Sequence, residues 1–221
     1  MDDTIIKTNA TRLLQMARLT FLHNARTRTP FKGVAAFYQA LCEGMRGAEP
    51  NPIFFISSSP WNLYDLLTDF MALHGIPKGP LLLRDFGING SQFMTSSHHS
   101  HKTKHIARLL HTYADLSFVL IGDSGQHDPE IYSQTVADFP GRIRAIYIRD
   151  VSQAARATTV RRLADDLNVY EVPMLLAPDT LRAAQDAAVR GLIDPAALNT
   201  IEKAKARDEA RPSDMEQLLS E

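Results

Sequence analysis

The chain has 221 residues, of which 44% are hydrophobic and 22% charged, a composition typical of a soluble globular domain with a sizeable core. Its formal net charge of −1 gives no global basic field, which argues against a nucleic-acid partner. Cys42 is the only cysteine, which excludes an internal disulfide. Neither a signal peptide nor an apolar run of about 18 residues is present, so we expect a cytoplasmic protein that meets membranes only peripherally.

Helical and strand-like segments alternate along the chain. Apolar runs too short for helices, most of them rich in Ile, Val or Phe, predict the strands, and apolar residues at helical spacing predict the helices. In chain order we expect helices at 11–23 and 34–45, a strand at 53–56, a helix at 61–74, a strand at 81–83, a helix at 102–113, a strand at 118–121, a helix at 129–138, a strand at 145–148, a helix at 153–167, a strand at 172–176 and a helix at 180–190. This alternation predicts an α/β fold, in which a parallel sheet carries helices on both faces.

Local signals mark the ends of several helices. Three dipeptides place a capping side chain before a proline at the first helical position: Ser59-Pro60, Asp128-Pro129 and Asp194-Pro195. Gly191 stands where a C-terminal cap belongs. Residues 201–211 are charged and poor in apolar side chains, so we divide the chain into a domain at 1–200 and a polar C-terminal tail at 201–221, expected to be an exposed helix.

Polar and acidic side chains follow the predicted strands. Ser57 comes directly after one strand and Asp123 and Asp128 after another, and ligands of parallel α/β sheets bind beyond the carboxyl ends of the strands. The opening Asp2 would reach the same edge if a strand preceded it. Carboxylates gathered at one edge repel each other unless a cation joins them, and oxygen ligands suit Mg²⁺. Together with hydroxyls and Lys102, this arrangement predicts a phosphate site.

Each of these residues has a plainer alternative. Asp128 could only cap a helix, Asp123 could hold a turn, and Lys102 could be a solvated lysine in a first helical turn, although that place opposes the helix dipole. Ser57 could belong to an ordinary loop and Asp2 to a frayed terminus.

Two other groups of side chains also allow two interpretations. A histidine cluster could bind a transition metal. Its members do not show a firm metal-ligand spacing, so a simpler interpretation is a polar loop with surface histidines; they are His98, His99, His101 and His105. Trp61, Leu63 and Tyr64 could pack in the core or contact acyl chains.

The order of these pieces resembles the haloacid dehalogenase superfamily of phosphate-transferring enzymes. The match is closer to one family within it, because several segments are similar to the App1 family of phosphatidate phosphatases: residues 28–34, 57–65, 79–85, 101–102 and 122–132. The resemblance covers residues 2–190. It implies a haloacid dehalogenase-like parallel sheet and a Mg²⁺ cofactor.

The resemblance also implies roles for individual residues. Ser57 would hydrogen-bond the transferring phosphoryl oxygens, and Lys102 would neutralise charge on the phospho-intermediate. Asp123 would bind Mg²⁺ directly, with Asp128 supporting the metal or its waters. Asp2 would protonate the leaving alkoxide and then activate water, while its backbone carbonyl faces the metal.

The start of the chain departs from the family pattern. The family motif reads Asp-x-Asp-Asp-Thr with the first Asp as nucleophile, and Asp2-Asp3-Thr4 match its last three positions. The nucleophile would therefore stand one residue before Met1, and the first strand of the sheet would precede it. Our hypothesis is that the sequence is a fragment or begins at an internal methionine, which the upstream codons would decide. We expect the 221-residue chain as written to be inactive and poorly stable.

The resemblance therefore predicts a Mg²⁺-dependent phosphatase that hydrolyses a phosphomonoester through an aspartyl phosphate, with phosphatidate as substrate and diacylglycerol as product. One alternative keeps the chemistry and takes a soluble phosphomonoester. The other is a non-catalytic module that binds phosphate or a partner. The expected partners are a phospholipid or other phosphomonoester and, by peripheral contact, a membrane surface, but not nucleic acid.

Overall fold

The computed structural model describes residues 32–84, 98–151 and 154–210. Its elements are α2 (Val34–Glu43), β1 (Phe55–Pro60), η1 (Trp61–Leu63), α3 (Tyr64–Leu73), β2 (Leu81–Arg84), α4 (His98–Thr112), β3 (Phe118–Asp123), α5 (Asp128–Asp138), β4 (Ile143–Arg149), α6 (Ala154–Asp166), η2 (Leu167–Tyr170), β5 (Met174–Ala177), α7 (Thr180–Val189) and α8 (Ala197–Glu209). Every predicted strand and helix within these ranges is present. The helix predicted at 11–23 and Asp2 lie outside the described residues.

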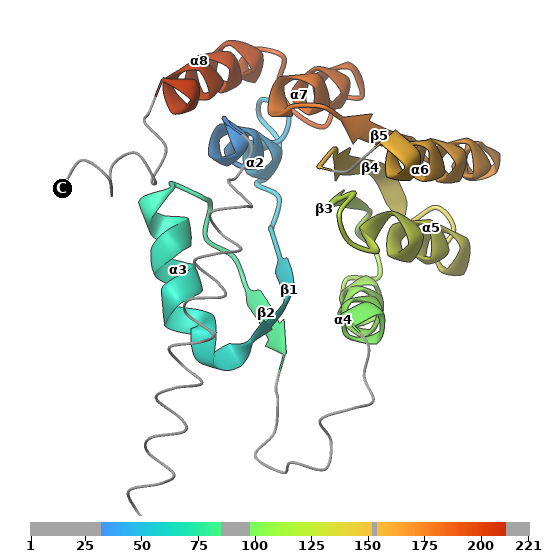
Figure 1. Cartoon of the computed structure of the whole chain (residues 1–221). Coiled ribbons are helices and arrows are strands. Elements are labelled where there is room, and N and C mark those ends of the chain that lie inside the picture. Colours follow the sequence, from blue (N-terminus) through green and yellow to red (C-terminus); the bar gives the residue numbers. More distant parts are fainter. Residues whose placement is uncertain (1–31, 85–97, 152–153, 211–221) are drawn as a thin grey trace, which may run out of the picture.

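All described strand pairs are parallel, as the βα alternation predicts. The strands form two sheets, one with the order β1-β2 and one with the order β3-β4-β5. Figure 1 shows the two sheets beside each other with helices around them. This α/β architecture is consistent with the haloacid dehalogenase-like fold that the sequence predicts. The first strand expected before Met1 is not tested by these residues and stays a prediction.

The three-stranded sheet is covered by helices on both faces. Along β4, Ala145 and Tyr147 pack with α2, α7 and α8, while Ile146 and Ile148 pack on the opposite face with α4, α5 and α6. Successive side chains of a strand point to opposite faces, so a strand buried on both sides is apolar throughout. The predicted strand at 145–148 is therefore the centre of the core (Figure 1).

Two helices link the sheets, and one of them does so through aromatic contacts. On α2, Phe37 meets Tyr147 of β4 edge-on with ring centroids 6.0 Å apart, and the next residue, Tyr38, meets Phe55 of β1 at 6.4 Å. Helix α4 also packs against β1. The sheets are thus held together by side-chain packing in the described part of the chain.

The helix ends follow the sequence signals in part. Gly191 has φ of +65° after α7, and the amides of Gly191 and Leu192 donate to Ala188 and Ala187, the paired bonds of a glycine C-cap. By contrast, Pro60 ends strand β1, which runs through the serine segment at residues 57–59, and no side chain caps η1.

The C-terminal helix differs from the exposed helix expected after residue 200. Helix α8 begins at Ala197, and its Ile201 is fully buried against α2 and α7. Charged residues dominate this segment, yet the few apolar ones share one face, which is sufficient to dock a short helix. The domain boundary at residue 200 stays a prediction.

Candidate active site

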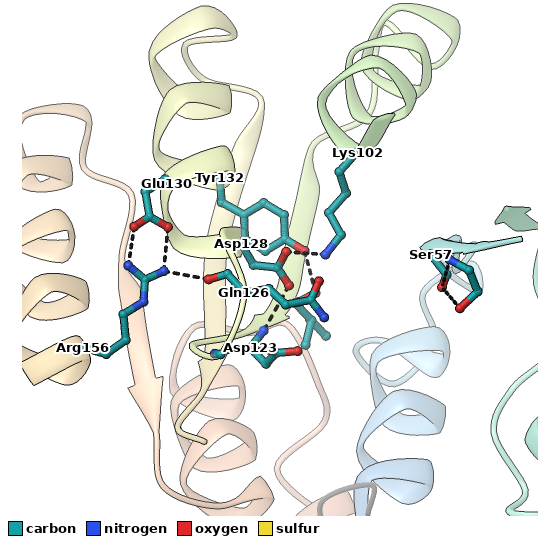
Figure 2. A network of polar contacts seen from close by, with 11 residues as sticks. Ser57, Lys102, Asp123, Gln126, Asp128, Glu130, Tyr132 and Arg156 are labelled. Carbon is teal, nitrogen blue, oxygen red and sulfur yellow. Dashed lines mark hydrogen bonds and ion pairs between the residues drawn. The ribbon is translucent and has the colours of Figure 1, made fainter. Parts of the chain in front are cut away.

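The candidate site lies where β3 ends and α5 begins. Asp123 is the last residue of β3 and Asp128 the first of α5, so a loop of only four residues separates the two carboxylates. Figure 2 shows them together with Lys102, which reaches toward them from α4. The structure therefore brings together three of the residues that the sequence singled out.

Asp128 faces the strand and is almost fully buried, with 3% of its surface exposed. One carboxylate oxygen, Oδ1, forms an ion pair with Lys102 Nζ, and the other, Oδ2, accepts from the Asp123 amide at 3.1 Å. The N-cap position of α5 belongs to His127, which makes no capping bond with its side chain. The alternative in which Asp128 serves only as a helix cap is therefore wrong.

Lys102 is in the second turn of α4, because the helix begins at His98 and not at the predicted residue 102. A lysine in the second turn opposes the helix dipole less than one in the first, so its place on the helix is a weaker sign of a role than the sequence suggests. Its side chain is 12% exposed and lies beside Asp128, which supplies the local anion. A partly buried ammonium at the end of β3 is well placed to neutralise an incoming phosphate.

Gly122 provides the space for Asp128. A Cβ atom at Gly122 would lie 2.6 Å from the Asp128 Cβ, closer than two such atoms can approach. Only glycine allows the first residue of α5 to pack against the end of β3. The lack of space for a Cβ atom therefore explains why a glycine precedes Asp123.

Ser57 stands apart from this group. It lies on β1, in the other sheet, and its Oγ donates to Ser59 Oγ at 3.0 Å and accepts from the Ser59 amide at 3.1 Å. Within the described ranges, the hydrogen bonds of Ser57 stay inside its own segment, on the side of the site opposite Asp123 in Figure 2. Its role toward a phosphate therefore stays a prediction.

The donors present suit a hard divalent cation in kind. Asp123 and Asp128 offer carboxylate oxygens at the end of β3, where the Asp123 amide donates to Asp128 Oδ2 at 3.1 Å, and Mg²⁺ prefers carboxylate ligands. Among the residues that the structure describes, no group of three or more His, Cys, Asp or Glu side chains could hold a metal, so these two carboxylates would form part of a ligand set. Asp2, the remaining predicted ligand, lies outside the described residues.

The described members of the histidine cluster, His101 and His105, form no such site with other described side chains either. His101 and His105 lie one turn apart on α4 with ring centroids 4.5 Å apart. Burial, with Arg108 and Lys104 nearby, lowers the pKa of His105. The uncharged form is therefore favoured, but the described side chains supply no further metal ligand to this pair.

The aromatic segment after the serines divides between core and surface. Leu63 is buried, whereas 63% of Trp61 and 48% of Tyr64 are exposed. Core packing is therefore right for Leu63 only, and two aromatic side chains beside the serine segment face solvent.

Sequence reasoning missed the residues that hold the loop of residues 124–127 from outside. Ser124 is fully buried; its amide donates to the Arg149 carbonyl and its Oγ accepts from the Val151 amide, each at 2.9 Å. Arg156 of α6 binds the same loop. No spacing rule joins a loop to a helix some 30 residues later, so the sequence carries no signal for Arg156.

The described residues contain no helix that is both long and apolar enough to cross a membrane. This finding concerns α2 to α8 alone and leaves peripheral contact with lipid as a prediction.

Known proteins give the site a context. The family described as phosphatidate phosphatase APP1, catalytic domain, matches residues 1–150. Phosphatidate phosphatase APP1 of Saccharomyces cerevisiae is 32% identical over 155 residues, which are 70% of this chain and 25% of that protein. An uncharacterised protein of Schizosaccharomyces pombe is 36% identical over 101 residues, 45% of this chain and 16% of its own length. The chain thus matches a quarter or less of these curated relatives, and no solved structure matches it.

Proposed function

Because the chain belongs to the family of phosphatidate phosphatase APP1 catalytic domains, we propose that it forms the catalytic part of a phosphatase that hydrolyses phosphatidate to diacylglycerol and inorganic phosphate. The observation that carries this proposal is the packing of Lys102, Asp123 and Asp128 at the end of β3. An ammonium and two carboxylates there suit a phosphate ester bound with a divalent cation.

In this proposal, some of the described residues would neutralise charge on the phosphate and others would hold the charged groups in position. Lys102 would neutralise the phosphoryl oxygens, and Asp128 holds its ammonium at the strand end through the ion pair. Asp123 would be a direct ligand of Mg²⁺, with Asp128 supporting it. When bound, the cation would supply charge neutralisation at the phosphate. Ser57 would donate to a phosphoryl oxygen once its bond to Ser59 is exchanged.

The proton transfers fall to Asp2. The phosphoryl group would pass from the lipid oxygen to an aspartate carboxylate, and Asp2 would protonate the diacylglycerol oxygen as it leaves. Asp2 would then take a proton from the water that releases inorganic phosphate. In this proposal, Asp2 would supply the acid/base, and Lys102, Asp123 and Asp128 would supply the charged groups around the transferred phosphoryl group.

The exposed aromatic pair supports a lipid substrate. Trp61 and Tyr64 follow the serine segment directly, and both are largely exposed. Aromatic rings with one polar end favour the boundary between water and lipid. We propose that they contact the apolar part of a phosphatidate-bearing surface while the headgroup reaches Lys102.

The test is an assay of phosphate release with Mg²⁺ on phosphatidate in mixed micelles and on a soluble phosphate ester. The protein expressed from the complete reading frame, the 221-residue chain and the Asp123→Asn variant are compared. Hydrolysis of phosphatidate that Asp123→Asn abolishes supports the proposal. Hydrolysis of the soluble ester alone would point to a soluble phosphomonoester phosphatase. Absence of both activities from the complete protein would contradict catalysis and leave a phosphate- or partner-binding module.

A further inference from the structure

The loop of residues 124–127 connects the two aspartates of the site, Asp123 and Asp128. Inside the loop, the Gly125 amide donates to Asp123 Oδ1 at 2.9 Å, which orients that carboxylate. The Asp123 amide in turn donates to Asp128 Oδ2 at 3.1 Å. Any change in the path of this loop therefore moves Asp123 relative to Asp128.

Arg156, on α6, holds the loop from the side away from Lys102. Its Nε donates to the Ser124 carbonyl at 3.0 Å and its Nη2 to the Gln126 carbonyl at 2.7 Å. Both terminal nitrogens also bind the carboxylate of Glu130, in the first turn of α5, with Nη2 to Oε2 at 2.7 Å. Figure 2 shows Glu130 and Arg156 on one side of the loop and Lys102 on the other.

These contacts need the geometry of a guanidinium. A planar fork can donate to a carboxylate with two nitrogens while the same group reaches two backbone carbonyls, whereas a lysine presents one ammonium. The hydrogen bond from Arg156 lowers the pKa of Glu130, which favours the charged pair. The loop is thereby tied to both α5 and α6.

Helix α6 is a firm base for this contact. Its Ala157 and Val160 are buried, with 5% and 0% of their surfaces exposed, so the helix is anchored in the core next to Arg156. At the other side of the loop, Ser124 is bound to the end of β4. Sites keep a precise geometry when core-anchored elements hold them in this way.

We propose that Arg156 is a positioning residue, which fixes the separation of Asp123 and Asp128 that a bound divalent cation requires. It acts through the loop and Glu130 and does not touch the cation. This inference rests on the metal site of the proposed function. Arg156 also lies outside residues 1–150, the part that the family matches.

The test uses the protein expressed from the complete reading frame, unsubstituted, with Arg156→Lys, and with Glu130→Gln as a milder variant. Arg162→Lys, an exposed position on the same helix, is the matched control. Mn²⁺ binding is measured by electron paramagnetic resonance, and hydrogen exchange of the amides at 124–127 is measured without metal. We expect Arg156→Lys to weaken Mn²⁺ binding about 10-fold, as loss of a supporting residue typically does, and to speed exchange in the loop. Glu130→Gln should give smaller changes, and Arg162→Lys none.

The outcomes separate this inference from the function on which it rests. Equal Mn²⁺ affinity and equal loop exchange in the unsubstituted protein and Arg156→Lys would overturn the role of Arg156 and leave the metal site intact. Failure of the unsubstituted protein to bind Mn²⁺ would overturn the metal site, and with it the metal-positioning role. If Arg156→Lys has the same melting temperature as the unsubstituted protein yet binds Mn²⁺ more weakly, the effect is on the position of the ligands and the inference is supported. If Arg156→Lys does not fold, Glu130→Gln gives the same comparison.

Discussion

At the end of β3, the absence of a side chain at residue 122 is what lets Asp128 reach the strand. Gly122→Ala would place a methyl group 2.6 Å from the Asp128 Cβ, and α5 begins there with little room to retreat. We expect a loss of about 1–3 kcal/mol in unfolding free energy, as for other overpacked sites. Mn²⁺ affinity should also fall, because Asp128 moves away from Asp123. Urea unfolding and Mn²⁺ titration measure the two effects.

Gly75→Ala is the control variant for Gly122→Ala, because it also replaces a glycine by alanine. Gly75 has φ of +65° but open space around it, so its substitution costs only backbone strain. Unchanged Mn²⁺ affinity in Gly122→Ala would show that Asp128 has no part in the cation site.

The ion pair between Lys102 and Asp128 gives a second prediction for a single residue. Their side chains are 12% and 4% exposed, so Lys102→Met would leave a buried carboxylate without its cation. Breaking one side of a buried pair typically costs about 3–5 kcal/mol. We expect a loss of that size in the absence of divalent metal, measured by urea unfolding.

The double variant Lys102→Met/Asp128→Asn distinguishes pairing from packing. Because the double variant removes both charges, it should recover much of the lost unfolding free energy. Added Mg²⁺ should stabilise Lys102→Met, because the cation compensates the charge of Asp128. If the double variant is as unstable as the single one, the cost arises from packing of the lysine stem and not from the charge.

Among the elements, the start of α2 is fitted closely against α8. Gly33 has φ of +80°, its amide donates to Asp208 at 2.8 Å, and a Cβ there would lie 3.1 Å from the Ile201 carbonyl and from Lys205. Gly47 has nearly the same φ, +82°, and a Cβ added there would meet no atom within 4 Å. Both substitutions to Ala should cost about 1 kcal/mol of backbone strain, and Gly33→Ala should cost more.

The difference between the two variants measures the fit of α2 against α8. Thermal or urea unfolding of Gly33→Ala and Gly47→Ala provides it. Equal losses of unfolding free energy in the two variants would mean that α8 shifts to admit the added methyl group without a loss of stability. That result would contradict the close docking of its Ile201.

A second contact of α8 depends on pH. Asp179 caps α7 by accepting from the Arg182 amide, and it also binds Lys205 of α8 at 2.8 Å. The bond from Lys205 lowers the pKa of Asp179 below its ordinary value of 3.8. A lowered carboxylate pKa stabilises the fold above the unfolded value, and this contribution is lost as the pH falls through the folded one.

Asp179→Asn tests this dependence because an amide oxygen can still cap α7. The unsubstituted chain should be more stable than Asp179→Asn at about pH 7, and the gap should narrow at about pH 3. Urea midpoints at the two pH values measure it. A gap that is constant with pH would show that the carboxylate charge contributes nothing to docking α8.

At this scale the sequence predicts elements better than their ends. The apolar run at 53–56 marks only the core-facing start of β1, and the extended backbone continues through the serines to Pro60, where no apolar pattern marks it. The strand-end residues Asp123 and Asp128 could be placed because parallel strands deliver their carboxyl ends to one edge. Arg156 could not, because its partners include backbone carbonyls, which leave no trace in side-chain spacing.

For the molecule as a whole, the arrangement into two sheets lies beyond what periodicity can predict, because strand order depends on packing between distant segments. The consequence of that arrangement is an uneven core. In β4, Ala145, Ile146 and Ile148 are fully buried, whereas β1, β2 and β3 have no buried residue and α3 has none among its ten. Strand β3 differs from β1 and β2 because it pairs with the buried strand β4 along its whole length. Stability within a domain follows such differences in burial.

We therefore expect native-state hydrogen exchange to divide the described chain into two cooperative units. Amides in β4 and β5, and those in β3 because it pairs with β4, should exchange only through global unfolding, with exchange free energies that fall with added urea at the full global slope. Amides in β1 and β2 should exchange through a smaller opening, with a shallower slope. Val160→Ala, which removes fully buried atoms beneath the three-stranded sheet, should lower protection in both units because it acts on the global step. Leu63→Ala, at the buried end of η1, should lower protection chiefly in β1 and β2. Equal slopes and equal responses in the two sheets would show instead that contacts through α2 and α4 make them one unit, in which case the site at β3 and the serines of β1 would open and close together.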